Sequence, residues 1–325
     1  MSASSPPSLR TLVFLLLPPM MWAGNAVVGR MMVGTMPPVA MNALRWLLVG
    51  VMLWPLVRRN GLDWGDVRAR WGYLACIGVL GVGTYNALQY LALLTSSPLS
   101  VTLIGSSVPV WMMLVGRIGF GQALRPRQLA GAALSVCGVM LVMTRGDLSV
   151  LGQLRLVPGD LLMLVASLAW ALYSWLLAHP PAHMVGHQRP AWDWATFLWV
   201  QVLFGSVWAV GSAGLEAVLT ASPQPGWLPS GVWPWIGMLF IAIGPSIVAY
   251  RCWGLGVQTV GPTMAAFFSN LTPIFAALWA ALLLGEHPRW YHPVALLLIV
   301  AGIAVSSGVQ KRRREPPRPL EPNGG

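Results

Sequence analysis

The chain has 325 residues, of which 56% are hydrophobic and only 9% are charged, and its formal net charge is +11. A soluble domain usually has about 25% charged residues, so a soluble fold of this length would leave too much apolar surface in water. The basic residues are spread through short polar segments and one tail, which membrane topology explains better than nucleic-acid binding.

Ten apolar runs follow one another along the chain, each close to the roughly 20 residues that cross a membrane as a helix. They lack the alternating pattern of barrel strands, so we expect helices. The predicted spans cover residues 11–34, 38–57, 71–94, 98–117, 126–144, 159–178, 194–213, 232–257, 263–284 and 291–309. The predicted fold class is an all-α integral membrane protein with ten transmembrane helices.

The segment from Thr259 to Ser307 repeats the plan of the segment from Thr95 to Met143, 164 residues earlier. The 49 aligned positions share nine identities, against roughly four expected from composition. The matches include residues that set backbone geometry, such as Pro109 with Pro273. We therefore expect a tail at 1–10, a first five-helix repeat at 11–144, a loop at 145–158, a second repeat at 159–309 and a basic, proline-rich cytoplasmic tail at 310–325.

The basic residues predict the orientation of the spans. With both termini in the cytoplasm, fourteen Lys and Arg residues fall inside, and only Arg145, Arg155 and Arg289 fall outside. Because each repeat has five spans, the two repeats enter the membrane from opposite sides. Inverted repeats are typical of transporters, in which two similar halves exchange conformations around a central site. We expect a multi-pass protein of a bacterial inner membrane.

Several short motifs resemble the EamA-like transporter family of the drug/metabolite transporter superfamily. The motifs are PMMWAGN at 19–25, ALRW at 43–46, Thr272-Pro273, LGE at 284–286 and Ala301-Gly302. One departure is Gln122 in the first repeat, where the family usually has a glutamate. The acidic residue of this motif is therefore kept only in the second repeat, at Glu286. The resemblance implies ten spans in two repeats and the movement of small metabolites, often amino acids and often outward.

Polar residues inside spans usually face a bundle interior or a wet cavity, because lipid makes them costly. Arg45 is the main candidate: it is the eighth residue of its span, no acidic residue in the spans neutralises it, and its donors suit a carboxylate or phosphate. An equal alternative is that Arg45 bonds carbonyls near Pro18 and Pro19. The expected substrate-binding residues are Arg45, Trp22, Asn25, Tyr85, Asn86, Gln89, Ser106, Trp170, Tyr173, Tyr250 and Asn270. The alternative for the polar ones is interhelical hydrogen bonding.

We expect no metal and no cofactor. The spacing of three histidines, His179, His183 and His187, would suit a metal, but two prolines interrupt the helix that would align them. The remaining interpretations concern single residues: Cys76, Cys137 and Cys252 as small buried hydrophobic side chains, Glu286 as a helix cap or ion-pair partner, and Arg251 as a cytoplasmic anchor that snorkels.

The leading hypothesis is a secondary transporter that exports small polar metabolites, amino acids or related compounds, by alternating access. A passive channel or facilitator is the alternative, because an inverted repeat favours alternating access without requiring it. A membrane-embedded enzyme is not expected, since the predicted spans contain no mid-membrane Asp, Glu or His. The same absence favours exchange over coupling through a buried carboxylate. The expected partners are a small-molecule substrate and the lipid bilayer, with a homodimer as a candidate assembly and no nucleic acid.

Overall fold

The computed structural model describes residues 8–32, 34–219, 226 and 228–307, and this part of the chain contains helices and no strands. Every predicted span is present in it. Nine spans are long and apolar enough to cross a membrane, and the tenth, α15, is described over Tyr291–Ser307. The predicted tail at 310–325 and all but the end of the tail at 1–10 lie outside the described residues. The chain is an all-α membrane protein.

The first repeat contains, in chain order, α1 (Leu9–Met31), α2 (Pro38–Asn60), the short α3 (Trp64–Ala69), α4 (Trp71–Ile77), the π-helical η1 (Gly78–Thr84), α5 (Tyr85–Ala92), α6 (Pro98–Gly105), α7 (Val108–Phe120) and α8 (Pro126–Met143). The third predicted span is thus α4, η1 and α5 in succession. The fourth is broken between α6 and α7, since Pro109 has no backbone N–H to continue the helix.

The second repeat contains α9 (Pro158–Ala178), α10 (Trp194–Leu219), α11 (Val232–Ile241), the π-helical η5 (Ala242–Val248), α12 (Ala249–Val260), α13 (Pro262–Ser269), α14 (Thr272–Leu284) and α15. Short 3-10 helices, η2 (Leu148–Gln153), η3 (Ala182–Met184) and η4 (Gly186–Gln188), lie in the links that precede and follow α9. The predicted span at 194–213 was too short, because α10 continues to Leu219 and includes Glu216.

The offset of 164 residues found in the sequence also holds in the backbone. The segments η1 and η5 lie 164 residues apart, and so do the breaks after Gly105 and after Ser269. Gly121 and Gly285 end α7 and α14 with φ angles of 64° and 69°, a left-handed conformation that glycine adopts without steric cost. The repeats therefore share their irregular segments as well as their helices.

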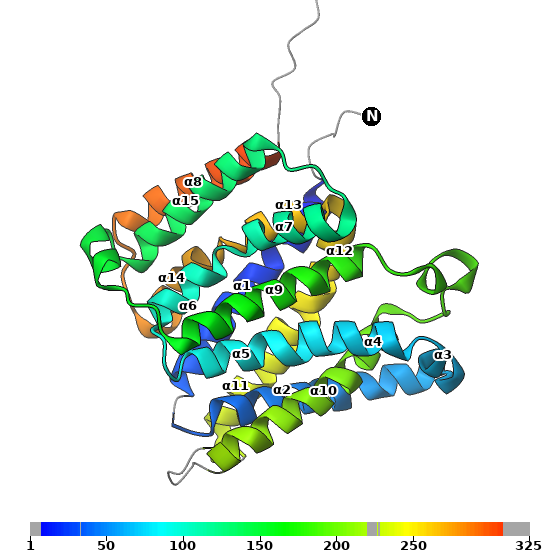
Figure 1. The fold of residues 1–325 in the computed structure, drawn as a ribbon. Helices are drawn as coiled ribbons and strands as arrows, with labels where there is room; N and C mark the ends of the chain where they lie inside the picture. Colours follow the sequence, from blue (N-terminus) through cyan, green and yellow to red (C-terminus); the bar gives the residue numbers. More distant parts are fainter. Residues whose placement is uncertain (1–7, 33, 220–225, 227, 308–325) are drawn as a thin grey trace, which may run out of the picture.

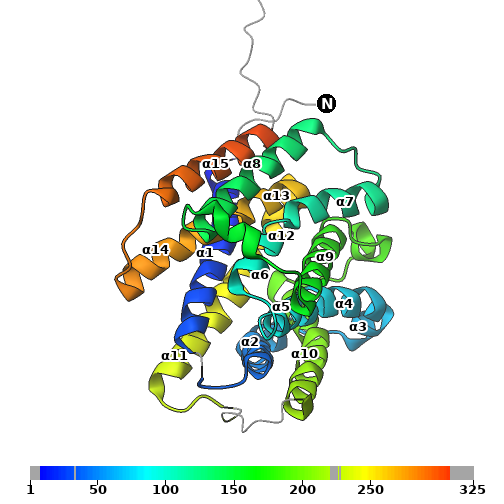
Figure 2. The ribbon, with the colours of Figure 1, turned by 60° about the vertical axis from the view of Figure 1, so that its left-hand side comes forward.

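Helices α8 and α15 lie side by side along one edge of the molecule (Figures 1 and 2). A Cβ atom on Gly131 would lie 2.6 Å from the carbonyl oxygen of Gly302, and one on Gly138 would lie 2.8 Å from that of Ala295. These two contacts are equivalent, because Gly131 corresponds to Ala295 and Gly138 to Gly302 in the 164-residue repeat. Small residues permit the close packing that holds membrane helices together.

Helix α9 runs through the middle of the bundle and packs against α5, α6, α7 and α12, while α2 and α10 pack together on the side opposite α8 and α15 (Figure 1). We call the side on which α1 begins the N-terminal face. The described ends of helices on that face include Leu9, Asn60, Phe120, Ala178, Val260 and Ser307.

Glu216 ties α10 to the start of α2. Its residue is only 7% exposed, and its carboxylate accepts the backbone N–H groups of Val39 at 3.2 Å and Ala40 at 3.1 Å. The first N–H groups of a helix have no partner within that helix, so Glu216 caps α2 from a different repeat.

The interpretations of Cys76 and Cys137 need correction, whereas those of Cys252, Glu286 and Arg251 agree with the structure. Cys76 and Cys137 are exposed and only Cys252 is buried. Lipid tails are as apolar as the interior of the bundle, so no hydrophobic free energy drives a small apolar side chain inward. Glu286 forms the expected ion pair, with Arg30 at 3.8 Å. Arg251 is exposed, and its Cζ lies 5.4 Å from the ring of Trp194 at the N-terminal face, as expected of a snorkelling side chain.

Candidate functional site

Seven aromatic side chains meet near the middle of the bundle. The aromatic cluster, as we define it, consists of Trp22 of α1, Trp46 of α2, Tyr85 of α5, Trp170 and Tyr173 of α9, and Tyr250 and Trp253 of α12. Trp170 contacts five of the others, with ring centroids 5.1 to 5.6 Å apart. Trp46 joins through Tyr250 at 5.0 Å. The cluster brings together helices of both repeats.

Helical spacing explains why α9 and α12 contribute two rings each. Trp170 and Tyr173 are three residues apart, as are Tyr250 and Trp253, so each pair lies on one helix face. One indole and one phenol of the cluster form hydrogen bonds in the interior. The Trp253 Nε1 donates to Ser174 Oγ at 3.1 Å, and the Tyr173 hydroxyl donates to Gln201 Oε1 at 3.2 Å. These bonds satisfy the polar ends of large buried side chains.

Arg45 lies beside the aromatic cluster and is only 2% exposed. Its Nε donates to Ser246 Oγ at 2.5 Å, and its Nη2 donates to the Pro245 carbonyl at 3.3 Å. The Arg45 Nη1 has no hydrogen-bond partner among the described residues. The predicted alternative partners, carbonyls near Pro18 and Pro19, are wrong, because the carbonyl that Arg45 bonds belongs to η5.

The irregular backbone of η5 creates the acceptors for Arg45. Pro245 has no N–H, so it cannot bond the Ile241 carbonyl as a regular helix would, and the Ser246 hydroxyl donates to that carbonyl at 2.8 Å. The Pro245 carbonyl also accepts the Trp22 Nε1 at 3.2 Å. Each group that Arg45 bonds therefore keeps a second hydrogen bond if the guanidinium is removed.

The two equivalent π-helical segments, η1 and η5, both supply a backbone carbonyl to the site. Asn86 and Tyr250 are equivalent positions, 164 residues apart, and the Asn86 side chain lies near the Tyr250 hydroxyl. That hydroxyl donates to the Gly81 carbonyl at 2.6 Å. Gly81 is the equivalent of Pro245, so the same carbonyl position is used in both repeats but by different side chains.

Five predicted site residues lie outside the aromatic cluster and its hydrogen bonds, and one of them is the buried Asn86. The Ser106 hydroxyl donates to the Leu103 carbonyl at 2.6 Å, at the break between α6 and α7. Gln89 is half-buried on α5, one turn after Tyr85. Asn25 Oδ1 and Asn270 Nδ2 are buried atoms without a partner among the described residues.

Sequence reasoning missed several residues that the fold brings to the site. They are Trp46, Trp253, Gln201 and Asn42, all buried. Trp46 and Trp253 had a usable signal, since Trp46 follows Arg45 directly and Trp253 lies one turn after Tyr250 on the same face. Asn42 is one turn before Arg45 and had the same signal.

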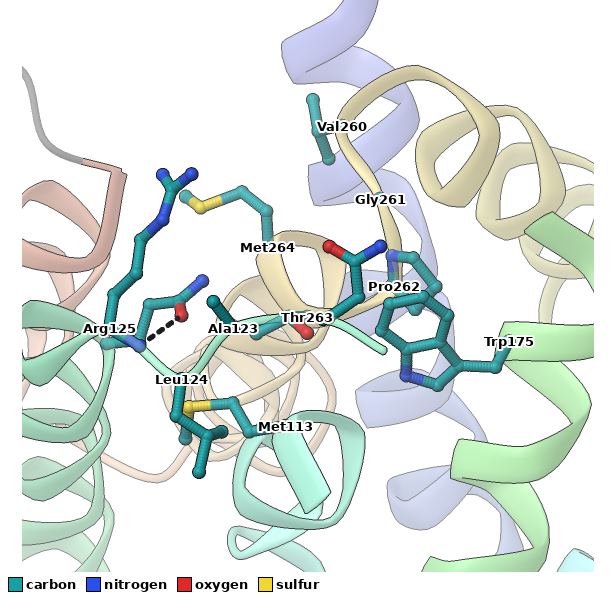
Figure 3. A pocket seen from close by; sticks show the side chains of 12 residues that line it. Met113, Ala123, Leu124, Arg125, Trp175, Val260, Gly261, Pro262, Thr263 and Met264 are labelled. Carbon is teal, nitrogen blue, oxygen red and sulfur yellow. Dashed lines mark hydrogen bonds between the residues drawn. The ribbon is translucent and has the colours of Figure 1, made fainter. Parts of the chain in front are cut away.

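A cavity of about 290 Å³ opens at the N-terminal face, between the α7–α8 and α12–α13 turns (Figure 3). Arg125, Gln122 and Thr263 supply polar groups, and Trp175 of α9 forms part of the wall. Trp170 lies five residues before Trp175, about 7.5 Å along the helix axis. The cavity is therefore about one and a half helical turns from the aromatic cluster.

A metal site has no support in the described part of the chain, where no three His, Cys, Asp or Glu side chains are grouped suitably for a metal ion. His179 instead stacks on Trp175, with ring centroids 5.1 Å apart.

Known proteins share this architecture. The chain is 26% identical to the transporter YyaM of Bacillus subtilis (strain 168) over 281 residues, which cover 85% of this chain and 87% of YyaM. It is 22% identical to the aromatic amino acid exporter YddG of Ancylobacter novellus over 283 residues, 86% of this chain and 91% of YddG. A solved crystal structure superposes with a TM-score of 0.71 at 20% identity, over 93% of this chain and 98% of that one, which shows the fold alone.

The family profile matches both repeats. The profile of the EamA-like transporter family covers residues 9–144 and again residues 157–308, which together make up most of the sequence. The chain therefore belongs to the EamA-like transporter family.

Proposed function

We propose that this protein is a secondary transporter that exports amino acids or related small polar metabolites across a bacterial inner membrane by alternating access. The observation that carries the proposal is the buried Arg45 guanidinium, which lies beside the aromatic cluster and whose Nη1 has no hydrogen-bond partner in the described part of the chain. A charged group at the middle of a membrane protein is costly unless a cavity, water or an anionic ligand stabilises it.

The arrangement of the two repeats supports alternating access. Irregular segments occur at matched positions in both repeats, and two of them, η1 and η5, each supply a backbone carbonyl to the site. Discontinuous helices around a central site are common in transporters built from inverted repeats, because the halves can exchange roles there. The name of the Ancylobacter novellus relative, an aromatic amino acid exporter, supports a substrate of the amino-acid class.

The proposed orientation has both termini in the cytoplasm, as the distribution of Lys and Arg predicts. The N-terminal face then lies in the cytoplasm, and the cavity beside Trp175 faces the compartment from which an exported compound enters. Single cysteines at Ser149 and at Gln188, in a variant without other cysteines, test this orientation. An impermeant thiol reagent added to whole cells should label the first position and spare the second; the reverse pattern contradicts the orientation.

The function itself is tested by comparing metabolites inside and outside cells that overproduce or lack the protein. We expect at least one amino acid or related compound to rise outside and fall inside on overproduction. Efflux into a medium containing the same unlabelled compound should be accelerated, as exchange requires. Efflux without such acceleration indicates a channel, chemical conversion of the compound indicates an enzyme, and no change in this class of compound overturns the proposal.

A further inference from the structure

Helix α2 presents three buried polar side chains on one face. Asn42, Arg45 and Trp46 are 0%, 2% and 0% exposed. Both amide atoms of Asn42, the Nη1 of Arg45 and the Nε1 of Trp46 have no hydrogen-bond partner among the described residues. Buried polar groups of folded proteins are almost always bonded, so a concentration of such atoms on one face needs an explanation.

Helix geometry brings these groups together. Residues three and four positions apart lie on the same side of a helix, and side chains lean toward the helix N-terminus, so the Arg45 head group lies over the turn that carries Asn42. The Arg45 Cζ lies 4.9 Å from the centre of the Trp46 ring. Bonds to Ser246 and to the Pro245 carbonyl fix the guanidinium through its Nε and Nη2, which leaves the Nη1 edge for a ligand.

The chemistry of the three groups favours an anion. The amide nitrogen of Asn42, the Nη1 of Arg45 and the Nε1 of Trp46 all donate hydrogen bonds, and the Asn42 Oδ1 is the one acceptor among the four atoms. A water molecule can satisfy individual donors but does not neutralise the guanidinium. Planar carboxylates pair well with Arg, and a carboxylate that carries an ammonium on the next carbon also supplies a donor for the Asn42 Oδ1.

We propose that Asn42, Arg45 and Trp46 form a subsite that binds the α-carboxylate of an amino acid, and that the Asn42 Oδ1 receives its α-ammonium group. This inference rests on the proposed transport function and specifies the substrate class. It assigns Asn42 a role in specificity, since an amine without a carboxylate loses the ion pair and a simple carboxylic acid leaves the Asn42 oxygen without a donor.

The test compares the full-length Asn42→Leu variant with wild type and with Ser135→Ala. Leucine has nearly the shape of asparagine and removes both unpartnered amide atoms. Ser135 is also fully buried, and its hydroxyl has no hydrogen-bond partner among the residues that the structure describes, but it lies on α8 at the crossing with α15, so it serves as the control. Purified proteins are titrated with the standard amino acids by calorimetry, and the best ligand is compared with its decarboxylated amine. Thermal unfolding of each protein is recorded without ligand.

We expect at least one amino acid to bind wild type and Ser135→Ala equally, and to bind Asn42→Leu at least about tenfold more weakly. The amine should also bind wild type at least about tenfold more weakly. The unfolding temperature of Asn42→Leu should be unchanged or higher, because the substitution removes unsatisfied polar atoms from the interior.

Three results overturn the inference. They are equal binding by Asn42→Leu, equal binding of the amine, and no binding of any amino acid. If the first of these results comes with a lower unfolding temperature, Asn42 is held by structural water. If cells export an amino acid while Asn42→Leu binds normally, the subsite fails and the proposed transport function stands. If amino acids bind as expected but cells export none, the transport function fails.

Discussion

The α8–α15 crossing and the central site both join the two repeats, but they differ in how far their side chains follow the repeat symmetry. At the crossing, equivalent residues make equivalent contacts, since Gly131 meets Gly302 as Gly138 meets Ala295. At the centre, equivalent positions hold different residues: Gly81 and Pro245, Val82 and Ser246, Asn86 and Tyr250. The backbone plan is shared in both places. The equivalent residues that make the close contacts at the crossing are all small, Gly or Ala, whereas those at the centre differ in size and polarity.

This difference indicates that the crossing is a structural scaffold and that the centre is the candidate ligand site. The crossing contains small residues, which allow the two backbones to approach closely, and a larger side chain would push the helices apart. The centre contains large aromatic rings and a guanidinium that is bonded on one side only. We infer that symmetry is kept where it provides packing and is lost where it would duplicate an asymmetric ligand site.

The largest expected effect is at the crossing. Gly131→Leu forces a side chain into the carbonyl of Gly302 and should cost about 3 kcal/mol of unfolding free energy, the upper range for overpacking. Gly211→Leu on α10 is the matched control, because a Cβ there meets nothing within 4 Å. Denaturant unfolding in detergent micelles measures both, and equal stability of the two variants would show that the crossing is not a close-packed scaffold.

An intermediate effect is expected at a third junction between the repeats, where Glu216 caps α2. Glu216→Gln keeps the size but weakens the bonds to Val39 and Ala40, and we expect a loss of about 1 to 2 kcal/mol. Glu286→Gln removes only the exposed pair with Arg30 and should change stability by less than about 0.5 kcal/mol. If both variants unfold alike, the capping role is wrong.

The smallest effect is expected at Trp22. Trp22→Phe keeps an aromatic ring against Trp170 but removes the bond to the Pro245 carbonyl. Because Arg45 still donates to that carbonyl, the cost should be about 0.5 to 1 kcal/mol. A loss above about 2 kcal/mol, measured by thermal unfolding, would mean that Trp22 and not Arg45 holds η5 in place.

The sequence predicted the spans well because hydropathy records which segments prefer lipid. It also predicted the repeat, since Pro109 and Gly121 recur at a fixed offset with defined backbone roles. It did not predict η1 and η5, because a π-helical segment has the same apolar composition as its neighbours. The end of α10 was missed for a related reason: Glu216 is charged, and the sequence does not show that its carboxylate accepts N–H groups of α2.

The site was predicted in part. Arg45, Trp170 and Tyr250 were found because charged and aromatic residues in spans are conspicuous. Trp46 and Trp253 were missed because hydropathy does not distinguish an aromatic ring that faces lipid from one that faces the centre. The cavity near Trp175 is formed by turns from both repeats, so no single segment of the sequence contains it.

The most direct test of the account is exchange transport by purified protein in vesicles. Vesicles are loaded with the unlabelled amino acid that overproducing cells export, and entry of the labelled compound is followed for wild type, Arg45→Lys and Arg45→Gln. We predict rapid exchange by wild type and initial rates lower by at least about tenfold for both variants. Both variants should stay folded, since Pro245 and Ser246 keep second hydrogen bonds. Folded variants that exchange at the wild-type rate would contradict the central role of Arg45.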